Sequence, residues 1–409
     1  MTSPADAQMN APAKNSLSTS LIDSHSGVLH FGFIVTGIAT TLLGPILPEL
    51  SSRSSLSDAR AGLFFVAQFL GSMSGVAISS FLLPRRGFRF TVATGFALTG
   101  AGIAALAVDS WTIGLLATAI YGCGLGLTIT GSNLFVAEAF PARRAAALSL
   151  LNFAWGVGAI LCPLLAMIAL RSNRLDTFLG GIAVCNALSA VAVAVLLNDP
   201  IPAKTSKKDP AERTENRAWK GGFLLALGLL FFLYVGTENA AAGWVASYAK
   251  RLNPTTGVDW ITTPSYFWAA LLLGRAVAPA LLRILPEKSF AVGSLMISFV
   301  GACVLVWAPS SLTVKLSVLL VGVGLAVIYP ILVAWLSESL GSAARRIGSV
   351  LFALAGLGGA TLPWIVGLAS AYWRTLRAGL VVPLVAILVM IFVTWAIAPK
   401  PFRVQRDLE

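Results

Sequence analysis

The chain has 409 residues, of which 57% are hydrophobic and only 11% are charged. Soluble domains carry about 25% charged residues, so this composition excludes an ordinary water-soluble protein and indicates a chain whose solvent is lipid. The formal net charge of +12 is typical of cytoplasmic loops that collect Lys and Arg, and no nucleic-acid partner is expected.

The chain begins with residues 1–26, which are polar and rich in serine and lack the basic start and apolar core of a signal peptide. We therefore expect a cytoplasmic tail there. Apolar runs of about 20 residues, long enough to cross a bilayer as helices, follow it. Six of them occur before the first polar break, near 27–50, 58–83, 88–108, 111–140, 145–171 and 177–197. Residues 27–197 are thus predicted to form an N-terminal six-helix bundle.

The polar break at 198–220 holds six basic residues together with Pro and Ser, so we expect a solvated cytoplasmic linker. Six more apolar runs come after it, near 221–249, 261–285, 289–308, 311–340, 344–371 and 376–398. They predict a C-terminal six-helix bundle over 221–398, and residues 399–409 are expected to form a second cytoplasmic tail.

Twelve spans place both termini on the same side of the membrane, and the basic residues indicate which side. With both termini and the linker inside, 19 of the 29 Lys and Arg residues lie on the inner side and 9 on the outer side. This asymmetry predicts that both termini are cytoplasmic. We expect a multi-pass, monomeric protein of the plasma membrane, the inner membrane in a bacterium, with the lipid bilayer as its surroundings.

An internal repeat relates the two predicted bundles at an offset of about 200 residues. The matching residues are Gly122 and Gly322, Gly124 and Gly324, Glu138 and Glu338, Gly156 and Gly356, Gly158 and Gly358, and Pro163 and Pro363. The tripeptide Ala-Arg-Arg occurs in both halves, at 142–144 and 344–346. Because each half holds six spans, the two repeats share one orientation in the membrane.

Four stretches resemble a known family. Residues 80–89 resemble the signature Gly-x3-Asp-Arg-x-Gly-Arg-Arg of the major facilitator superfamily, with Ser80 and Pro84 in place of the Gly and the Asp. Three others are similar to its fucose-galactose-glucose symporter branch: LNFAWGVGAILCPLL at 151–165, YVGTENAAAGW at 234–244 and SYFWAALLLGR at 265–275. The resemblance covers residues 27–398.

This resemblance implies an all-α membrane protein with the major facilitator fold, in which twelve helices form two pseudo-symmetric six-helix bundles around a central solute path. It also implies alternating access, a monosaccharide as the small-molecule solute, and H⁺ or Na⁺ as the coupling ion. One departure is clear. Fucose-type members carry carboxylates in spans one and four, whereas here Glu49 is at the outer end of span one and Ile129 occupies the span-four position.

Two ionisable residues lie deep within predicted spans, where a charge is costly and is by default a functional hypothesis. Glu238 is 18 residues after Lys220 and 12 before Lys250. Its carboxyl can be a neutral acid or an anion paired with a cation, so we expect it to couple ion entry to a conformational change, unless it only bonds neighbouring helices. Arg275 can bind the solute, pair with Glu238 or lock the halves together.

Amides and aromatic rings at membrane depth are the candidates for binding the solute, because mixed polar and aromatic pockets hold small polar ligands. The candidate residues are Gln68, Asn133, Asn152, Trp155, Asn239, Trp244 and Tyr329. Each can instead form hydrogen bonds that hold helices together.

Acidic and basic residues are duplicated at the inner ends of spans four and ten. The two clusters are Glu138 with Arg143 and Arg144, and Glu338 with Arg345 and Arg346. We expect them to be gating residues whose salt bridges close the cytoplasmic side in the outward-open state. Arg85 and Arg86 of the basic signature belong to the same gating hypothesis.

Functions other than solute uptake are the alternatives for this sequence. Gly71 to Gly75 read Gly-Ser-Met-Ser-Gly, which approaches the pattern GxSxG but has Met73 in place of its central serine. That motif also needs a strand-to-helix turn, and this stretch lies inside an apolar span, so no enzyme is expected. No cofactor or metal site is indicated. The predicted function is a secondary active transporter of a small polar solute. The alternatives are a proton-coupled drug or metabolite efflux antiporter and, less favoured, a receptor that does not transport.

Overall fold

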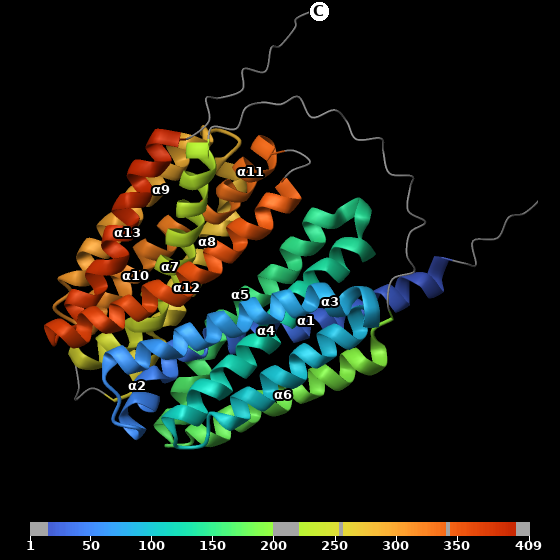
Figure 1. Ribbon diagram of the computed structural model, residues 1–409, viewed down its shortest axis with the longest axis horizontal. Helices are drawn as coiled ribbons and strands as arrows, with labels where there is room; N and C mark the ends of the chain where they lie inside the picture. Colours follow the sequence, from blue (N-terminus) through green and yellow to red (C-terminus); the bar gives the residue numbers. More distant parts are fainter. Residues whose placement is uncertain (1–14, 199–220, 253–256, 341–343, 398–409) are drawn as a thin grey trace, which may run out of the picture.

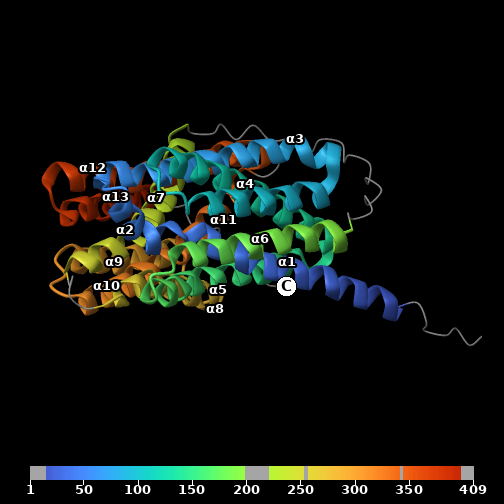
Figure 2. The same ribbon diagram turned by 90° about the horizontal axis from the view of Figure 1, so that it is seen from below.

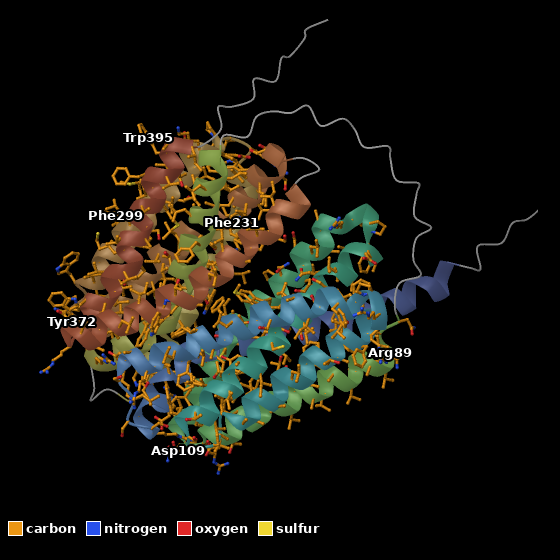
Figure 3. The ribbon with its side chains drawn as sticks, viewed as in Figure 1. Arg89, Asp109, Phe231, Phe299, Tyr372 and Trp395 are labelled. Carbon is orange, nitrogen blue, oxygen red and sulfur yellow. The ribbon has the colours of Figure 1, made fainter. Side chains whose placement is uncertain are left out.

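The computed structural model describes residues 15–198, 221–252, 257–340 and 344–397, and their regular elements are helices (Figure 1). Helices satisfy every backbone hydrogen bond within the segment, as a lipid solvent demands. Apolar side chains also cover the outside of the bundles. Trp395 is 66% exposed, whereas Phe231 is buried inside the C-terminal bundle (Figure 3). This distribution fits a protein whose outer surface contacts lipid.

In the N-terminal half, the described residues 15–198 form six α-helices and a short 3₁₀ helix. They are α1 (Asn15–Thr41), α2 (Leu43–Arg53), α3 (Asp58–Ala105), α4 (Trp111–Ala139), η1 (Pro141–Arg143), α5 (Arg144–Arg171) and α6 (Leu175–Leu196). Helix α1 begins at Asn15, within the segment that the sequence predicts to be a tail. Helices α1 and α2 form the first apolar span, with a bend of 44° between them.

Helix α3 contains two of the predicted spans. Its 48 residues would extend about 72 Å as a straight helix, more than twice the roughly 30 Å of hydrocarbon in a bilayer. The helical path is interrupted at Gly87, where φ is 77°. Glycine adopts this left-handed conformation without steric cost. The chain therefore reverses there, between the two runs predicted at 58–83 and 88–108.

In the C-terminal half, the residues that the structure describes form seven α-helices and one 3₁₀ helix. They are α7 (Gly221–Leu252), η2 (Asp259–Thr262), α8 (Thr263–Leu281), α9 (Glu287–Val306), α10 (Ser311–Leu325), α11 (Ile328–Leu340), α12 (Ala344–Trp373) and α13 (Leu376–Ile397). Helices α10 and α11 together form one apolar span, Ser311–Ser339. The break between them comes just before Pro330, which lacks the N–H that would continue the helical hydrogen bonding.

The described helices group into the twelve predicted passages. Nine of the helices in these ranges are long and apolar enough to cross a membrane, and the bent pair α1–α2 adds a tenth. Counting α3 as two passages and including α8 gives six before the 198–220 segment and six after it. The all-α fold that the sequence predicts is therefore confirmed.

The two halves form separate bundles that meet along a few helix pairs. Helix α3 packs against α12, α2 against α7, and α5 against α8. Figures 1 and 2 show α1–α6 and α7–α13 as adjoining bundles. In Figure 1 the bundles converge beside α2 and diverge toward the ends at which α5 and α12 begin. We call the converging ends the outer ends, because the basic-residue asymmetry predicts that they face away from the cytoplasm.

Glycine permits a close approach of α7 and α12 within the C-terminal half. A Cβ added to Gly358 would overlap the backbone oxygen of Phe232, and overpacking of this kind costs about 1–3 kcal/mol. We expect Gly358→Ala to lower the thermal unfolding midpoint of the detergent-purified protein. Gly180→Ala is the matched control, since an added Cβ there meets nothing within 4 Å. Equal midpoints for the two variants would contradict this packing.

Candidate functional site

Glu238 and Arg275 form an ion pair in the middle of the C-terminal half. In α7, which spans Gly221–Leu252, Glu238 lies 17 residues after the first residue and 14 before the last. Arg275 comes from α8, and its Nη2 lies 3.9 Å from Oε2 of Glu238. Glu238 is only 8% exposed. The pairing that the sequence left open is present, and it holds two opposite charges far from either end of α7.

A tyrosine completes the surroundings of the guanidinium. Tyr234 precedes Glu238 by one helical turn, so both side chains lie on one face of α7. Its hydroxyl accepts a hydrogen bond of 3.1 Å from Nη2 of Arg275. Nε of Arg275 is buried and has no hydrogen-bond partner among the described residues. An unsatisfied buried donor costs about 1–3 kcal/mol, so this N–H is available to a ligand that brings an acceptor.

Aromatic rings surround this charged pair. The ring centroids of Tyr234 and Tyr329 are 5.7 Å apart, and Phe231 lies 5.7 Å from Tyr329 in an edge-on arrangement. Phe352 of α12 is 5.6 Å from Phe231. Tyr329 stands at the start of α11, directly after the break from α10. Of these four residues the sequence singled out Tyr329 alone, although the spacing of Tyr234 from Glu238 is a signal that would have found a second.

The two helices that carry the ion pair also contact the N-terminal half. A Cβ added to Gly44 of α2 would lie 2.9 Å from the backbone oxygen of Ala242, so that face of α7 packs on α2. Glu238 precedes Ala242 by four residues and therefore shares its face. In α8, Leu272 packs against α5, and Arg275 follows it by three residues. Both charged residues thus lie within one helical turn of residues that contact the N-terminal half, while Tyr234 on the same face of α7 packs on Tyr329 of the C-terminal half.

Polar residues of the N-terminal half gather around Thr40 on the opposite side of the boundary between the bundles. Gln68 donates from Nε2 to the backbone oxygen of Thr40 at 2.9 Å, and Trp155 donates from Nε1 to the Thr40 hydroxyl at 3.3 Å. Trp155 also meets Trp268 of α8 edge-on, with 5.6 Å between ring centroids. The structure therefore brings together two residues that the sequence predicts, Gln68 and Trp155, through Thr40, which it did not. Trp268, also not predicted, extends the group to α8.

The three candidate asparagines each donate an amide N–H to a backbone oxygen four residues earlier. Asn133 and Asn239 do so at 2.8 and 2.9 Å. Asn152 does the same at 2.8 Å and also donates to Oδ1 of Asn133 at 3.4 Å. Asn152 lies three residues before Trp155 and is solvent- or lipid-accessible. The Asn133–Asn152 pair thus links α4 and α5, while Asn239 adjoins Glu238 in the chain.

Trp244 lies apart from these residues. Its side chain is 1% exposed, and Nε1 donates to the backbone oxygen of Pro363 at 2.8 Å. Its ring centroid is 6.2 Å from that of Phe65 in α3. The N–H is therefore already bonded where α3, α7 and α12 pack together, so Trp244 closes the boundary between the halves on its outer side.

The duplicated clusters at the inner ends have exposed side chains wherever the structure describes them. The exposed members are Glu138, Arg143, Arg144 and Glu338. None of these four occurs in an ion pair between described residues. The side chains of Arg345 and Arg346 lie outside the described residues, so the gating role of both clusters stays a prediction.

The arginines of the basic signature lie over aromatic rings. The guanidinium carbon of Arg85 is 3.3 Å from the ring centroid of Phe81, and that of Arg86 is 5.6 Å from the centroid of Phe90. Both arginines are exposed. Their predicted gating role also stays a prediction.

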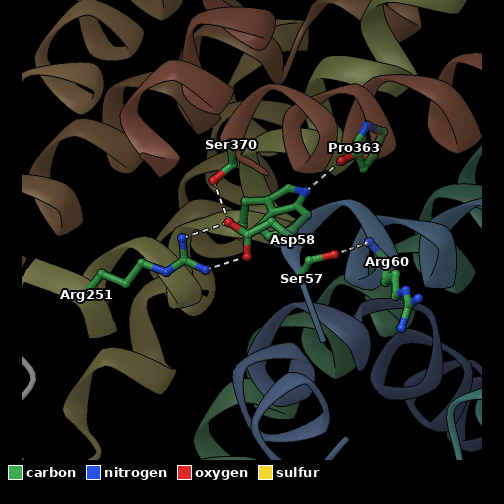
Figure 4. Close-up of polar contacts among 7 residues, drawn as sticks. Ser57, Asp58, Arg60, Arg251, Pro363 and Ser370 are labelled. Atoms are coloured by element: carbon green, nitrogen blue, oxygen red, sulfur yellow. Dashed lines mark hydrogen bonds and ion pairs between the residues drawn. The ribbon is translucent and has the colours of Figure 1, made fainter. Parts of the chain in front are cut away.

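A cluster of three residues, here called the outer contact, joins the halves at their outer ends (Figure 4). Nη1 of Arg251, in the last turn of α7, lies 2.8 Å from Oδ2 of Asp58, and Nη2 donates to the other carboxylate oxygen. Ser370 of α12 also donates to Asp58. The geometry is bidentate, which makes it stronger than a single charged hydrogen bond.

Local structure explains how Asp58 is presented. Asp58 is the first residue of α3, and the side chain of Ser57 caps that helix by accepting from the backbone N–H of Arg60. An acid in a first helical turn is favoured by the helix dipole. A second ion pair, from Nη2 of Arg171 in α5 to Oδ1 of Asp259 in η2 at 2.9 Å, joins the halves at the same ends. Neither contact is among those that the sequence predicts.

Comparisons with known proteins agree with this architecture. A family model described as the Major Facilitator Superfamily matches residues 29–363. The sodium-dependent glucose transporter 1A of Mus musculus is 23% identical over 383 residues, covering 85% of this chain and 90% of that protein. A putative glucose/galactose transporter of Helicobacter pylori strain J99 is 26% identical over 369 residues, covering 83% and 87%.

A solved structure shares the fold. The crystal structure of a D-xylose-proton symporter superposes with a TM-score of 0.74 at 17% sequence identity, covering 93% of this chain and 98% of that one. At this identity the likeness concerns the arrangement of the helices and not the solute.

Proposed function

Because this chain belongs to the Major Facilitator Superfamily, we propose that it is a secondary active transporter that carries a monosaccharide together with a proton by alternating access. The observation that carries the proposal is the Glu238–Arg275 pair, which is central in the membrane and lies on helices that contact the opposite bundle. The printed names of the relatives, a sodium-dependent glucose transporter and a putative glucose/galactose transporter, support a hexose as the solute.

The chemistry around the pair suits a sugar. Nε of Arg275 is a buried donor without a protein acceptor, and a sugar hydroxyl can accept from it. The hydroxyl groups of Tyr234 and Tyr329 can donate and accept, and their rings offer apolar faces to the C–H surface of a pyranose. Trp155 adds an indole ring from the N-terminal half. A few directed polar groups within aromatic walls are the usual composition of a small-molecule site.

A proton suits this site better than sodium. Glu238 is far from both ends of its helix. Of the other acids of the described residues, Asp23 lies in the part of α1 that precedes the first apolar run, and the rest lie near helix ends or in loops. One carboxyl is enough to carry a proton, whereas a bound metal cation needs several oxygen ligands. A sodium ion placed about 4 Å from the Arg275 guanidinium would be repelled by about 4 kcal/mol at an effective dielectric constant of 20. The described residues hold no group of three or more acidic, His or Cys residues that could offset this.

The pair then acts as a switch between two states. When Glu238 is protonated, its attraction for Arg275 is lost, and the guanidinium can donate to the solute. When the proton leaves, the carboxylate attracts Arg275 again and competes with the solute for Nη2, the nitrogen that faces Glu238. Solute and proton therefore favour each other's binding, which is the reciprocal coupling that symport requires.

The outer contact and the Arg171–Asp259 pair support a state that is closed toward the outside. We place the protein in the plasma membrane as a monomer, with both termini in the cytoplasm. In this orientation the state releases solute inward. Salt bridges between the predicted gating clusters would form in the opposite state.

The test is uptake of radiolabelled glucose, galactose and xylose into proteoliposomes. An inward proton gradient of one pH unit is expected to drive up to about tenfold accumulation at one proton per sugar, and a sodium gradient alone is expected to drive none. Accumulation driven only by sodium would contradict the choice of ion. Movement of lipophilic cations without any sugar would favour efflux, and stabilisation by a sugar without flux would favour a receptor.

A further inference from the structure

A groove lies between the second arm of α3 and the C-terminal part of α6, outside the site described above. It has a volume of about 480 Å³, within the range of small-molecule sites. One wall follows α3 from Arg86 to Ala97, and the other follows α6 from Ala190 to Ala194. Helix α6 packs on α1, α3 and α5, so the groove belongs to the N-terminal half and opens on its surface.

The polar end of the groove is basic. Arg86 and Arg89 flank the turn at Gly87 and both line the groove. Figure 3 shows Arg89 at the end of the N-terminal bundle that is remote from the C-terminal bundle. No acidic residue occurs in the sequence from 59 to 108 or from 177 to 198. The parts of α3 and α6 that form the walls, residues 86–97 and 190–194, therefore supply two arginines and no carboxylate, and this end of the groove suits an anion.

Apart from Thr94, the remainder of the groove is apolar, and it is open to lipid. Phe90 is 47% exposed and Val191 is 60% exposed, while small residues such as Ala93 and Ala194 leave room between them. The distance along α3 from Arg86 to Ala97 is about 16 Å. Half of a bilayer's hydrocarbon core is about 15 Å. The groove thus has the length of one leaflet, with its charged end at headgroup depth.

We propose that this groove binds an anionic phospholipid of the cytoplasmic leaflet, with its phosphate at Arg86 and Arg89 and one acyl chain along Ala97 and Ala190. The predicted orientation places the turn at Gly87 on the cytoplasmic side, the side on which anionic lipids attract basic residues. An acyl chain fills the apolar length, and a headgroup phosphate takes the charged end. This binding does not depend on the proposed transport function.

The experiment is native mass spectrometry of the detergent-purified protein mixed with equal amounts of phosphatidylglycerol and phosphatidylethanolamine carrying the same acyl chains. Wild type is expected to retain phosphatidylglycerol preferentially, by about fivefold for each arginine. Arg86→Gln/Arg89→Gln should abolish the preference, and Arg86→Lys/Arg89→Lys should keep most of it. Ala97→Trp, which fills the apolar part, should reduce retention of both lipids.

The matched control is Arg174→Gln/Arg374→Gln, which removes two exposed arginines at the outer ends and should leave retention unchanged. Thermal unfolding midpoints show whether each variant is folded. Equal lipid preference in wild type and the double Gln variant at Arg86 and Arg89 would overturn the proposal. So would unchanged retention in Ala97→Trp, or displacement of the lipid by soluble glycerol phosphate, because a site for a free phosphate needs no acyl groove.

Discussion

Replacing Glu238 with Gln is expected to convert the protein from a concentrating symporter into a carrier that only equilibrates its solute. The amide has nearly the shape of the protonated acid but cannot release a proton. Arg275 then lacks its carboxylate partner and stays available to the solute. At a gradient of one pH unit, the ratio of internal to external sugar should fall from about tenfold to one, while exchange of labelled for unlabelled sugar continues.

Uptake and exchange assays in the same proteoliposomes separate these two activities. Asp109→Asn is the matched control, because Asp109 is an exposed loop acid that accepts a hydrogen bond of 3.1 Å from Ser54. It should accumulate sugar as wild type does. If Glu238→Gln still concentrates sugar against its gradient, Glu238 is not the proton carrier. Loss of both uptake and exchange would instead indicate a damaged site.

Replacing Asp58 with Asn is expected to shift the protein toward its outward-open state. The substitution removes the charge that Arg251 contacts with two nitrogens and leaves the hydrogen bond of Ser370 weakened. Charged hydrogen bonds contribute about 1.5–3 kcal/mol, but exposed pairs contribute less than about 1 kcal/mol. Asp58 is 14% and Arg251 47% exposed, so we expect an effect between these limits, of fivefold or more in the population ratio.

Spin labels at positions 174 and 374, one on each half at the outer ends, report this change as a distance distribution in liposomes. The four native cysteines are replaced first. Asp58→Asn should add a longer distance, and Asp58→Arg/Arg251→Asp should restore the wild-type distribution. Asp176→Asn breaks an ion pair of 2.7 Å within the N-terminal half and should change nothing. Identical distributions for Asp58→Asn and wild type would show that the outer contact does not hold this state.

The membrane spans could be predicted from the sequence because each needs a long apolar run, which is a local property. The start of α1 at Asn15 could not, because it depends on how far a helix continues beyond its apolar part. Pro330 is a local signal for a bend near the break between α10 and α11, but the residues at which one helix ends and the next begins depend on packing. The reversal at Gly87 was predictable as a loop between two runs, although its left-handed backbone conformation was not.

The residues of the candidate site also divide into those that could be recognised from the sequence and those that could not. Glu238 and Arg275 were recognisable because a charge in the middle of an apolar run is rare. Phe231 and Phe352 are two among many apolar residues, and only their contacts with Tyr329 distinguish them. Asp58 and Arg251 are 193 residues apart in sequence, and nothing local to either residue indicates the partner. Trp244 shows the converse, since its depth in the span suggested a ligand while its N–H is bonded within the protein.

The central claim is that Glu238 carries a proton with each sugar. It is tested most directly by the current that a rapid jump in glucose concentration produces on a supported membrane, in buffer without sodium and at equal pH on both sides. Wild type should give an inward positive current that increases with glucose, and Glu238→Gln should give none while still exchanging glucose. A current of equal size in Glu238→Gln, or glucose transport by wild type without any current, would contradict the claim.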